Sequence, residues 1–322
     1  MTGRAFDLTV AILTYDRPAG LAATLASCMG QCNRLGLMIE IVVVDNHPSG
    51  SGEAVVQAAR AEAAWPIRYI QDLSRNMATL RNRGFAEARG RWLAIIDDDE
   101  TADAGWTDAL IGALQSTDTD IAIGPRLAVF EAGAPPSYDP KGEQFVRDLS
   151  LPDLAEIRLT APSGKPRYGL GTGNSAFDLQ RCFPDRQPAM REAFGDAGGE
   201  DAELFVRLHR QGRRIIWAAR ARVTETVSRN RTAVPYRLIR TRRETQHYVS
   251  IYVDAARRPG LARLELLAKG LMQLAAGAIM TLVTLEFASD TRLRWRRLME
   301  HGLGKLTWRR PVGFIDESAG PT

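Results

Sequence analysis

Four consecutive acidic residues, Asp97, Asp98, Asp99 and Glu100, directly follow the apolar segment RWLAII. Adjacent carboxylates repel one another, so a fold tolerates them best where a cation or several N–H donors compensate their charge. Hard divalent cations prefer oxygen ligands, and magnesium takes one or two carboxylates together with substrate phosphates. The four residues therefore predict a site for Mg²⁺ or Mn²⁺ and a phosphorylated ligand. The alternative is a solvated acidic turn.

A second acidic pair, Glu200 and Asp201, lies at the start of a predicted helix, Gly199–Gln211, after a glycine-rich turn. The helix macrodipole stabilises negative charge there, so N-terminal capping explains the pair without any chemistry. A carboxylate that stays ionised and projects into a cleft is also a workable general base. The spacing alone leaves both interpretations open.

Asp45 and Arg81 are further candidates for binding a nucleotide. Asp45 ends the apolar run IEIVVV, where a carboxylate can accept the N3–H of a uracil or form an Asx turn. Arg81 lies in a segment with helical spacing, Met77–Arg89, from which its guanidinium can reach a diphosphate or stay solvated.

The elements that must position these residues alternate along the first 125 residues. Short apolar runs predict strands, and the segments between them predict helices. Such an alternation indicates a mostly parallel sheet covered on both faces, with ligands bound outside the carboxyl ends of the strands. The predicted strands are Leu8–Leu13, Ile39–Val44, Ile67–Ile70, Trp92–Ile96 and Ile121–Ile123, and the predicted helices are Pro18–Arg34, Ser51–Ala64 and Met77–Arg89.

The rest of the chain is divided by its pattern. Residues 127–188 are rich in Pro and Gly, which predicts antiparallel or irregular structure along one wall of a cleft. A short strand is expected at Arg214–Trp217, and helices at Tyr236–Ala256, Leu261–Leu285 and Thr291–His301. We therefore expect one domain over 1–230, with halves 1–125 and 126–230, followed by a helical region over 231–322.

The composition of the 322 residues, with 45% hydrophobic and 25% charged side chains, excludes disorder for most of the chain. Three cysteines cannot staple a chain of this size, and we interpret Cys28, Cys32 and Cys182 as buried or partly buried thiols in a reducing compartment. The first residues, interrupted by Asp7, do not fit a signal peptide, so a cytoplasmic location is expected.

Charge is distributed unevenly. Residues 1–205 hold 19 basic and 29 acidic side chains, whereas residues 206–310 hold 23 basic and 7 acidic ones. The basic third predicts an anionic partner: a nucleic acid, a membrane surface or a phosphorylated substrate. Because it contains no recognised reader motif, we expect no nucleic acid.

The segment Gly270–Leu285 has no charged residue and is flanked by arginine-rich segments and two tryptophans, Trp295 and Trp308. Its sixteen residues lie below the usual length of a membrane span. Basic flanks with tryptophan suit the anionic face of a membrane. The segment therefore predicts an interfacial helix; the alternative is a helix buried against the rest of the chain or a second subunit.

Taken in order, the motifs resemble those of the family 2 inverting glycosyltransferases. They are TYDRP, EIVVVDN, NMATLRNRGFAEARGRWLAIIDDDE, GTGN and GGEDAELFVRLHRQGRRIIW, and they cover about residues 6–225. The resemblance implies an α/β, Rossmann-like nucleotide-diphospho-sugar transferase fold (A-type glycosyltransferase). It also implies transfer of one sugar from a nucleotide-diphosphate sugar, with a UDP-sugar favoured, to a hydroxyl group. The basic, apolar C-terminal third resembles the subgroup that builds bacterial exopolysaccharide on lipid carriers, such as the succinoglycan-type enzymes.

The resemblance also implies roles for individual residues. Thr14 and Tyr15 with Asp45 would hold the nucleoside, and Arg17, Arg81, Asp97 and Asp98 would complete the nucleotide-sugar site. Asp99 would coordinate the metal, and Asp201 would be the base with Glu200 beside it. Many relatives place a second metal ligand, a histidine, where this sequence has Glu225, so the identity of that ligand stays open.

The implied partners are a polyprenyl-diphosphate-linked saccharide acceptor and an anionic membrane, which predicts a peripheral location on the inner face of the plasma membrane. A non-catalytic sugar-nucleotide or polyanion-binding protein is the main alternative, but the intact Asp99 and Asp201 argue against a decayed site. A nucleotidyltransferase would need a Gly-rich phosphate loop with a lysine near the first strand, and LTYDRPAGLAATL has none. The chain also lacks the Q-x-x-R-W motif of processive synthases, which favours addition of a single sugar.

Overall fold

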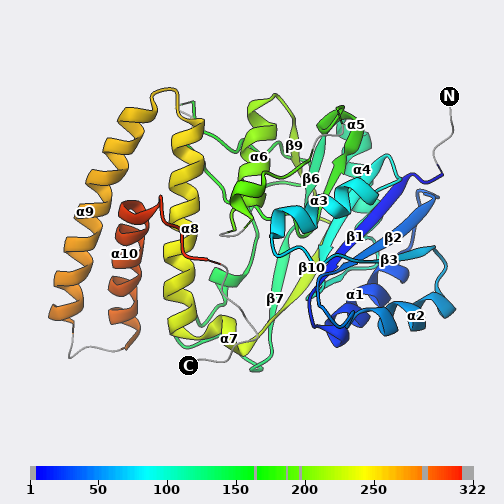
Figure 1. Ribbon diagram of the computed structural model, residues 1–322, viewed down its shortest axis with the longest axis horizontal. Helices are drawn as coiled ribbons and strands as arrows, with labels where there is room; N and C mark the ends of the chain where they lie inside the picture. The colour runs from blue at the N-terminus through cyan, green and yellow to red at the C-terminus, as the bar shows by residue number, and fades with distance from the viewer. Residues whose placement is uncertain (1–4, 163–164, 186–187, 196–197, 285–288, 314–322) are drawn as a thin grey trace.

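The computed structural model describes residues 5–162, 165–185, 188–195, 198–284 and 289–313, which form an α/β unit followed by three long helices (Figure 1). The larger sheet has the strand order β3-β2-β1-β4-β8-β6-β9 and is parallel except for β8. Its strands are β1 (Leu8–Thr14), β2 (Ile39–Asp45), β3 (Ile67–Gln71), β4 (Trp92–Asp97), β6 (Ile121–Ile123), β8 (Ser175–Asp178) and β9 (Ile215–Trp217). The predicted strands are thus confirmed, each to within one residue at either end.

The register of the central strands aligns the polar residues at one edge. β1 pairs in parallel with β2, so that Thr14 lies opposite Asp45, and with β4, so that Leu13 lies opposite Asp97. The carboxyl ends of all three strands therefore meet at the same edge of the sheet. The chain segments that follow these strands are held there side by side.

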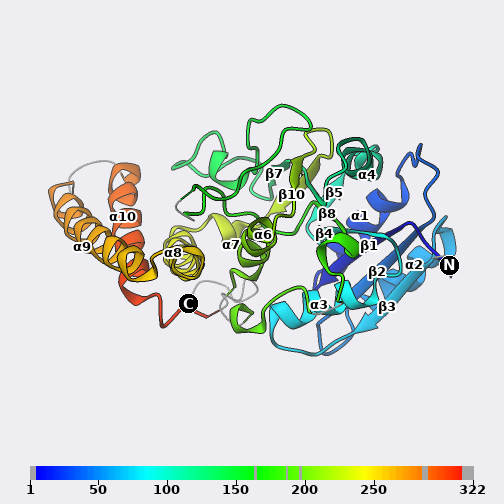
Figure 2. The same cartoon turned by 90° about the horizontal axis from the view of Figure 1, so that it is seen from above.

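Helices cover both faces of this sheet, as the alternating pattern predicts (Figures 1 and 2). Leu8, Val10 and Ile12 of β1 pack against α1 (Pro18–Met29), α2 (Glu53–Glu62) and α4 (Trp106–Thr117). The opposite face, which includes Ala11, is covered by α3 (Met77–Glu87) and α6 (Glu200–Arg210). Each fully buried Leu or Ile contributes about 1.5–3 kcal/mol by leaving water. These strands therefore provide a stable platform for a highly charged edge.

A smaller sheet extends that edge. It consists of β5 (Glu100–Ala102), β10 (Val223–Val227) and β7 (Arg126–Phe130), in the order β5-β10-β7. β5 begins immediately after the Asp97–Asp99 run, and its antiparallel pairing with β10 places Glu225 opposite Glu100. The pairing brings Glu225, which is far away in the sequence, next to the acidic run.

The C-terminal helices are α7 (Arg229–Thr232), α8 (Val234–Ala255), α9 (Pro259–Val283) and α10 (Ser289–Thr307), so the three long helices are present as predicted. The predicted end of the second one, at residue 285, lies outside the described residues. α8 packs on α6 through Val206, Ile251 and Ala255. The predicted domain boundary at residue 230 falls within α7.

α9 and α10 approach one another closely through glycines. A Cβ added at Gly277 would lie 2.6 Å from a Met299 side-chain atom, and one at Gly302 would lie 2.8 Å from the Gly270 carbonyl. α9 is nevertheless the outermost helix in Figure 1, and along one stripe it exposes large apolar side chains. They are Leu261, Leu264, Leu267, Leu271, Met272, Ile279, Leu282 and Val283.

Cys32 and the segment 127–188 differ in part from what the sequence predicts. Cys32 is exposed rather than buried, because α1 ends at Met29 and the chain leaves the helix before reaching it; Cys28 and Cys182 are buried as expected. The described part of 127–188 contains the antiparallel strand β8, the short α5 (Leu179–Cys182) and the 3₁₀ turn η1 (Glu143–Phe145), and much of the rest is irregular, as predicted. It also holds most of β7, which pairs in parallel with β10 and so departs from the prediction. A second 3₁₀ turn, η2 (Glu192–Phe194), precedes α6.

Candidate active site

Asp98 ties the loop after β1 to the end of β4. Its carboxylate accepts hydrogen bonds from Thr14 Oγ1 at 2.8 Å and from the Tyr15 backbone N–H at 3.4 Å, and it pairs with Arg17 at 3.1 Å. Burial raises the pKa of Asp98, whereas Arg17 and the Thr14 hydroxyl oppose that rise. The structure thus brings together four of the predicted nucleotide-sugar residues.

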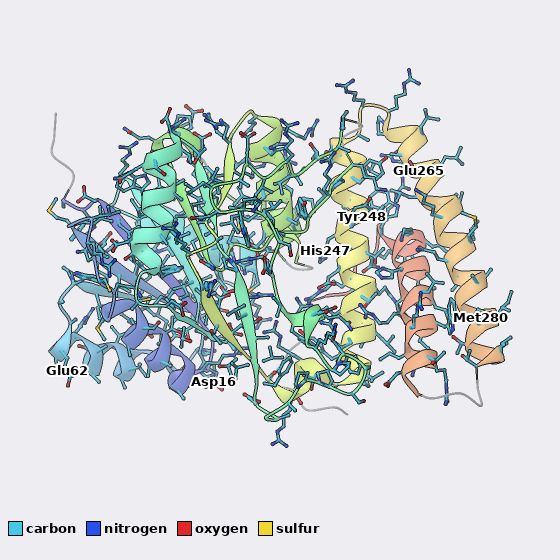
Figure 3. The ribbon with its side chains drawn as sticks, turned by 180° about the vertical axis from the view of Figure 1, so that it is seen from behind. Asp16, Glu62, His247, Tyr248, Glu265 and Met280 are labelled. Atoms are coloured by element: carbon cyan, nitrogen blue, oxygen red, sulfur yellow. The ribbon has the colours of Figure 1, made fainter. Side chains whose placement is uncertain are left out.

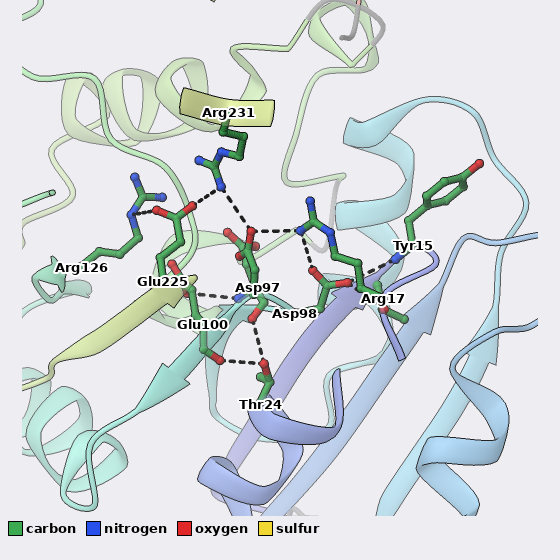
Figure 4. A network of polar contacts seen from close by, with 11 residues as sticks. Tyr15, Arg17, Thr24, Asp97, Asp98, Glu100, Arg126, Glu225 and Arg231 are labelled. Carbon is green, nitrogen blue, oxygen red and sulfur yellow. Dashed lines mark hydrogen bonds and ion pairs between the residues drawn. The ribbon is translucent and has the colours of Figure 1, made fainter. Parts of the chain in front are cut away.

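Asp99 and Glu225 belong to a chain of alternating charges, in which Figure 4 labels Glu225 and the three arginines. Arg17 lies 3.0 Å from Asp99, and Arg231 lies 3.3 Å from the same carboxylate oxygen. The same nitrogen of Arg231 also contacts Glu225, and Arg126 lies 3.0 Å from the other oxygen of Glu225. Burial, with Glu225 and Asp97 nearby, raises the pKa of Asp99 to about 7. The two predicted metal ligands therefore share one cationic partner.

Asp97 and Glu100 contact each other within the acidic run; Glu100 is fully buried and Asp97 is partly buried. The Asp97 backbone N–H donates to the Glu100 carboxylate at 3.1 Å, and burial raises the pKa of both side chains. The GTGN turn lies against them: a Cβ at Gly173 would lie 2.5 Å from an Asp97 oxygen, so a larger residue there would displace that carboxylate. Arg147 fixes this turn by donating to the carbonyls of Gly171 and Gly173, at 3.0 and 2.5 Å.

Arg81, Glu200 and Asp201 form a second cluster. Arg81 pairs with Glu200 and lies 3.3 Å from Asp201, whose carboxylate also accepts a hydrogen bond from Thr172 Oγ1 at 2.9 Å. The Glu200 side chain is 5% exposed and that of Asp201 is 19% exposed. Burial raises the pKa of Glu200 to about 7, and the Arg81 guanidinium opposes the rise. Asp201 is therefore the more accessible acid.

The start of α6 depends on a strained turn. Gly199, just before Glu200, has φ +90°, a backbone conformation that favours glycine, and a Cβ there would lie 2.6 Å from the ring of His247. His247 lies on the side of α8 that faces the α/β unit (Figure 3). The C-terminal helices thus help to place the acidic pair.

Electrostatics connect the two clusters. The pKa of Asp97 is raised mainly by burial, and charges from both sides act on it: Arg81 and Asp201 from one, Arg126 and Glu225 from the other. Asp97 therefore lies between the base candidate and the metal-ligand candidates. A ligand at this edge of the sheet would meet both clusters.

Asp45 stands apart from this arrangement. It is fully buried, and its carboxylate accepts hydrogen bonds from the backbone N–H groups of His47 and Gly52 and from the Tyr69 hydroxyl, at 2.7–2.8 Å. It thus closes the turn that the Asx alternative predicts. Beside that turn, the Tyr15 and His47 rings meet edge to face, with centroids 5.1 Å apart. Tyr15 is half exposed.

The carboxylate oxygens at this edge suit a hard divalent cation whose remaining ligands are phosphate oxygens. Among the described residues no group of three or more His, Cys, Asp or Glu side chains could hold a metal on its own. Magnesium, however, uses one or two carboxylates with substrate phosphates. Asp99 and Glu225 provide two carboxylates directed at one point of positive charge. In addition, one buried oxygen of Glu100 has no hydrogen-bond partner among the described residues.

Arg126, Arg147 and Arg231 have central positions that no sequence motif predicted. Each comes from a segment outside the recognised motifs, and each meets a distant carboxylate or carbonyl through the tertiary fold: Arg126 meets Glu225, Arg147 meets Gly171 and Arg231 meets Asp99. Their sole signal in the sequence is the excess of arginine over lysine, 38 against 4, which does not point to particular positions.

Comparisons with known proteins identify the domain that carries this edge of acidic and basic side chains. Residues 9–163 match the family Glycosyl transferase family 2, so the chain contains a family 2 glycosyltransferase domain and the resemblance seen in the sequence is confirmed. The solved structure of Staphylococcus aureus TarS 1-349 in complex with UDP is similar, with a TM-score of 0.54 at 15% identity, over 94% of this chain and 91% of that one. This likeness confirms the predicted A-type fold.

Curated relatives point the same way. The chain is 27% identical over 256 residues to the succinoglycan biosynthesis protein ExoM of Rhizobium meliloti (strain 1021). The aligned region covers 80% of this chain and 78% of that protein. It is 26% identical to the hyaluronan synthase of Pasteurella multocida over 64% of this chain but 23% of that protein. The predicted likeness to succinoglycan-type enzymes is therefore also confirmed.

Proposed function

We propose that this chain is an inverting glycosyltransferase that moves one sugar from a nucleotide-diphosphate sugar, preferably a UDP-sugar, to an acceptor hydroxyl. The observation that supports this proposal best is the position of Arg81, which contacts Asp201 and acts electrostatically on Asp97. A candidate base, a cation for a diphosphate and the acidic run are thereby gathered at one edge of the sheet.

Transfer of a sugar with inversion requires a base for the acceptor hydroxyl and positive charge beside the leaving diphosphate. The acceptor oxygen forms a bond to the anomeric carbon while the bond from that carbon to the diphosphate oxygen breaks on the opposite side. Asp201 removes the hydroxyl proton, a step typically worth ~10²–10⁴ in rate, and Thr172 orients its carboxylate. Arg81 and Arg17 stabilise the negative charge that develops on the leaving nucleoside diphosphate.

A divalent cation, Mg²⁺ or Mn²⁺, fits this scheme as a Lewis acid for the leaving diphosphate. Asp99 would hold it, with Glu225 as the second protein ligand. Both carboxylates already lie beside guanidinium groups. A divalent ion bound to them would supply positive charge at the same place.

The nucleoside end of the donor belongs near Tyr15 and Asp45. Tyr15 offers an exposed aromatic ring beside His47, a surface on which a base can stack. Asp45 supports this surface by fixing the turn at residues 46–52, and it would read the base edge only by exchanging one of its present partners. The complex of a similar protein, TarS, with UDP supports a uridine nucleotide as the first to test.

For the acceptor we propose a saccharide on a polyprenyl diphosphate. A hollow of about 550 Å³ lies between α10 and the loop near Tyr138, and its lining includes Trp295, Arg294 and Arg297. Aromatic and basic side chains suit sugar rings and phosphates. The Tyr138 hydroxyl donates to the carbonyl of Thr232, the residue after Arg231, so the hollow adjoins the candidate active site.

A peripheral location on the cytoplasmic face of a membrane follows from the same acceptor. Among the described residues, α9 is the helix that is long and apolar enough to cross a membrane. Only 17% of its most apolar 18-residue window is buried within the protein. The apolar stripe of α9 is exposed, and the arginine-rich helices α8 and α10 lie beside it. We therefore propose that α9 lies in an anionic membrane surface.

A donor screen tests the proposed function. The thermal midpoint and the release of nucleotide are measured with UDP-, GDP- and dTDP-sugars, each with Mn²⁺, with Mg²⁺ or with chelator. We expect one nucleotide to raise the midpoint and to be turned over only with a divalent ion. If a donor binds but neither its sugar is transferred nor its nucleotide released with any acceptor tested, the chain is the non-catalytic binding protein.

A further inference from the structure

Arg231 occupies an unusual place in the site. A single nitrogen of its guanidinium contacts both Asp99, at 3.3 Å, and Glu225, the two side chains that would hold the metal (Figure 4). The Arg231 side chain is 10% exposed. A buried guanidinium is costly unless carboxylates compensate it, so these two contacts stabilise the arginine as well as the acids.

The surrounding ion pairs are balanced in formal charge. Three carboxylates alternate with three guanidinium groups along the chain of contacts, so each of these carboxylates is already paired with a guanidinium group. Its members are Arg126, Glu225, Arg231, Asp99, Arg17 and Asp98. A divalent ion that enters alone has to take the place of a guanidinium group beside carboxylates that are already paired and largely buried, which costs free energy. A divalent ion together with a donor diphosphate brings little net charge.

We propose that Arg231 compensates Asp99 and Glu225 before donor and metal bind, and that it thereby couples metal binding to nucleotide binding. This inference rests on the proposed function. While no donor is bound, the guanidinium compensates Asp99 and Glu225 and opposes a lone metal ion. When donor and metal enter together, the ion takes over the carboxylates and the guanidinium turns to the diphosphate, its other natural partner. Arg231 is thus a positioning residue that selects the metal–donor complex over the free ion.

The place of Arg231 in the fold suits this exchange. It lies on α7, the four-residue helix between β10 and α8, and α7 is fixed by the hydrogen bond from Tyr138 to the Thr232 carbonyl. The side chain alone therefore has to move. The neighbouring Arg229 on the same helix is exposed, and its hydrogen bonds among the described residues use backbone atoms: its N–H donates to Glu131 at 3.2 Å, and its carbonyl accepts from the Thr232 hydroxyl at 2.8 Å. Arg229 is therefore a matched control.

The test measures the affinity for Mn²⁺ by electron paramagnetic resonance, without nucleotide and then with UDP. For the wild type and Arg229→Gln we expect weak binding of Mn²⁺ alone and a strong increase with UDP. Arg231→Gln should bind Mn²⁺ alone at least ~10-fold more tightly, and UDP should increase its affinity less, because coupling free energies of this size are typical between linked ligands. Arg231→Lys, which retains a charge but reaches one carboxylate, should lie between them.

An Arg231→Gln affinity for Mn²⁺ alone that is equal to or weaker than that of the wild type would overturn the inference. Circular dichroism checks that the variant is folded, and if it is not, the same criterion applies to Arg231→Lys. The comparison with Mn²⁺ alone needs no nucleotide. If the wild type binds no nucleotide sugar, the proposed function fails, while the claim about Arg231 is still decided.

Discussion

The Arg81 guanidinium lies 3.3 Å from the Asp201 carboxylate and also pairs with Glu200, so one arginine of α3 holds both acids at the start of α6. The two acids differ in environment, since Glu200 is nearly buried and Asp201 is partly open. Arg81 therefore compensates Glu200 inside the protein, whereas Asp201 remains accessible to an acceptor. This difference identifies Asp201, rather than Glu200, as the proposed base.

Asp201→Asn should lower turnover by ~10² or more and leave the affinity for the donor nearly unchanged, because it removes an interaction made in the transition state. Initial rates of transfer and donor titrations measure the two effects. Glu156→Gln, a distant and partly exposed carboxylate, is the control. A comparable loss of donor affinity in Asp201→Asn would show that the residue binds the donor instead.

Asp99→Asn should abolish transfer and remove the effect of Mn²⁺ on nucleotide binding while the fold survives. The substitution takes away a hard oxygen ligand beside the diphosphate. Isothermal titration with UDP, with and without Mn²⁺, measures this effect. Asp103→Asn, which lies shortly after β4 and is exposed, should behave like the wild type. Wild-type activity of Asp99→Asn in the presence of chelator would contradict the metal assignment.

Arg81→Gln should destabilise the fold by about 3 kcal/mol, because it leaves the buried Glu200 without its cation. The pKa of Glu200 is already raised to about 7, above its ordinary value, so ionisation of this group opposes folding as the pH rises. The loss should therefore be larger at pH 8 than at pH 5. Urea unfolding at both pH values measures it, and Arg81→Gln/Glu200→Gln should recover much of it. Equal losses in the single and double variants would exclude the ion pair as the cause.

His301 should make the packing of α10 on α8 sensitive to acid. Its Nδ1 lies 2.8 Å from the Thr245 hydroxyl, and burial, with Lys305 and Arg297 nearby, lowers its pKa, while Glu244 and Glu300 act in the opposite direction. A lowered folded-state pKa means that this group costs stability as the pH falls below its ordinary value of about 6.5. The thermal midpoint should drop less between pH 7.5 and 5 in His301→Asn than in the wild type. Parallel curves for the two proteins would contradict this role.

The apolar stripe of α9 should bind anionic vesicles. The full chain is expected to float with liposomes at low salt and to be released at high salt, because apolar and basic side chains act together. Leu264→Gln/Ile279→Gln should weaken binding at least ~10-fold, since each change removes an apolar side chain that would leave water. Met38→Gln/Leu73→Gln changes equally exposed apolar residues elsewhere and should have little effect. If the full chain does not bind vesicles at low salt, the membrane role is excluded.

Most of the fold could be predicted from the sequence because local pattern and burial agree there. The strands β1, β2 and β4 are continuous apolar runs, and parallel pairing then aligns Thr14, Asp45 and Asp97 at one edge. The surroundings of each polar side chain at that edge could not be predicted. Asp45 follows a strand just as Asp97 does, yet the turn at residues 46–52 surrounds it with donors from Gly52 and Tyr69.

The arginines of the candidate site escaped prediction for a different reason. Arg126 meets Glu225 because β7 pairs with β10, and Arg231 meets Asp99 because β10 also pairs with β5, which are properties of the tertiary fold. Arginine is abundant along the whole chain, so its type and spacing contain no information about these partners. The acidic residues had a recognisable order in the sequence, whereas the basic residues that compensate them did not.

The stereochemistry of transfer tests the central claim most directly. With the donor that the screen selects, proton nuclear magnetic resonance follows the anomeric configuration of the first product formed, either a glycoside or the sugar released to water. A single in-line displacement with Asp201 as base predicts inversion at the anomeric carbon, and loss of that product signal in Asp201→Asn. Retention of configuration, or an unchanged rate in Asp201→Asn, would contradict the proposed mechanism.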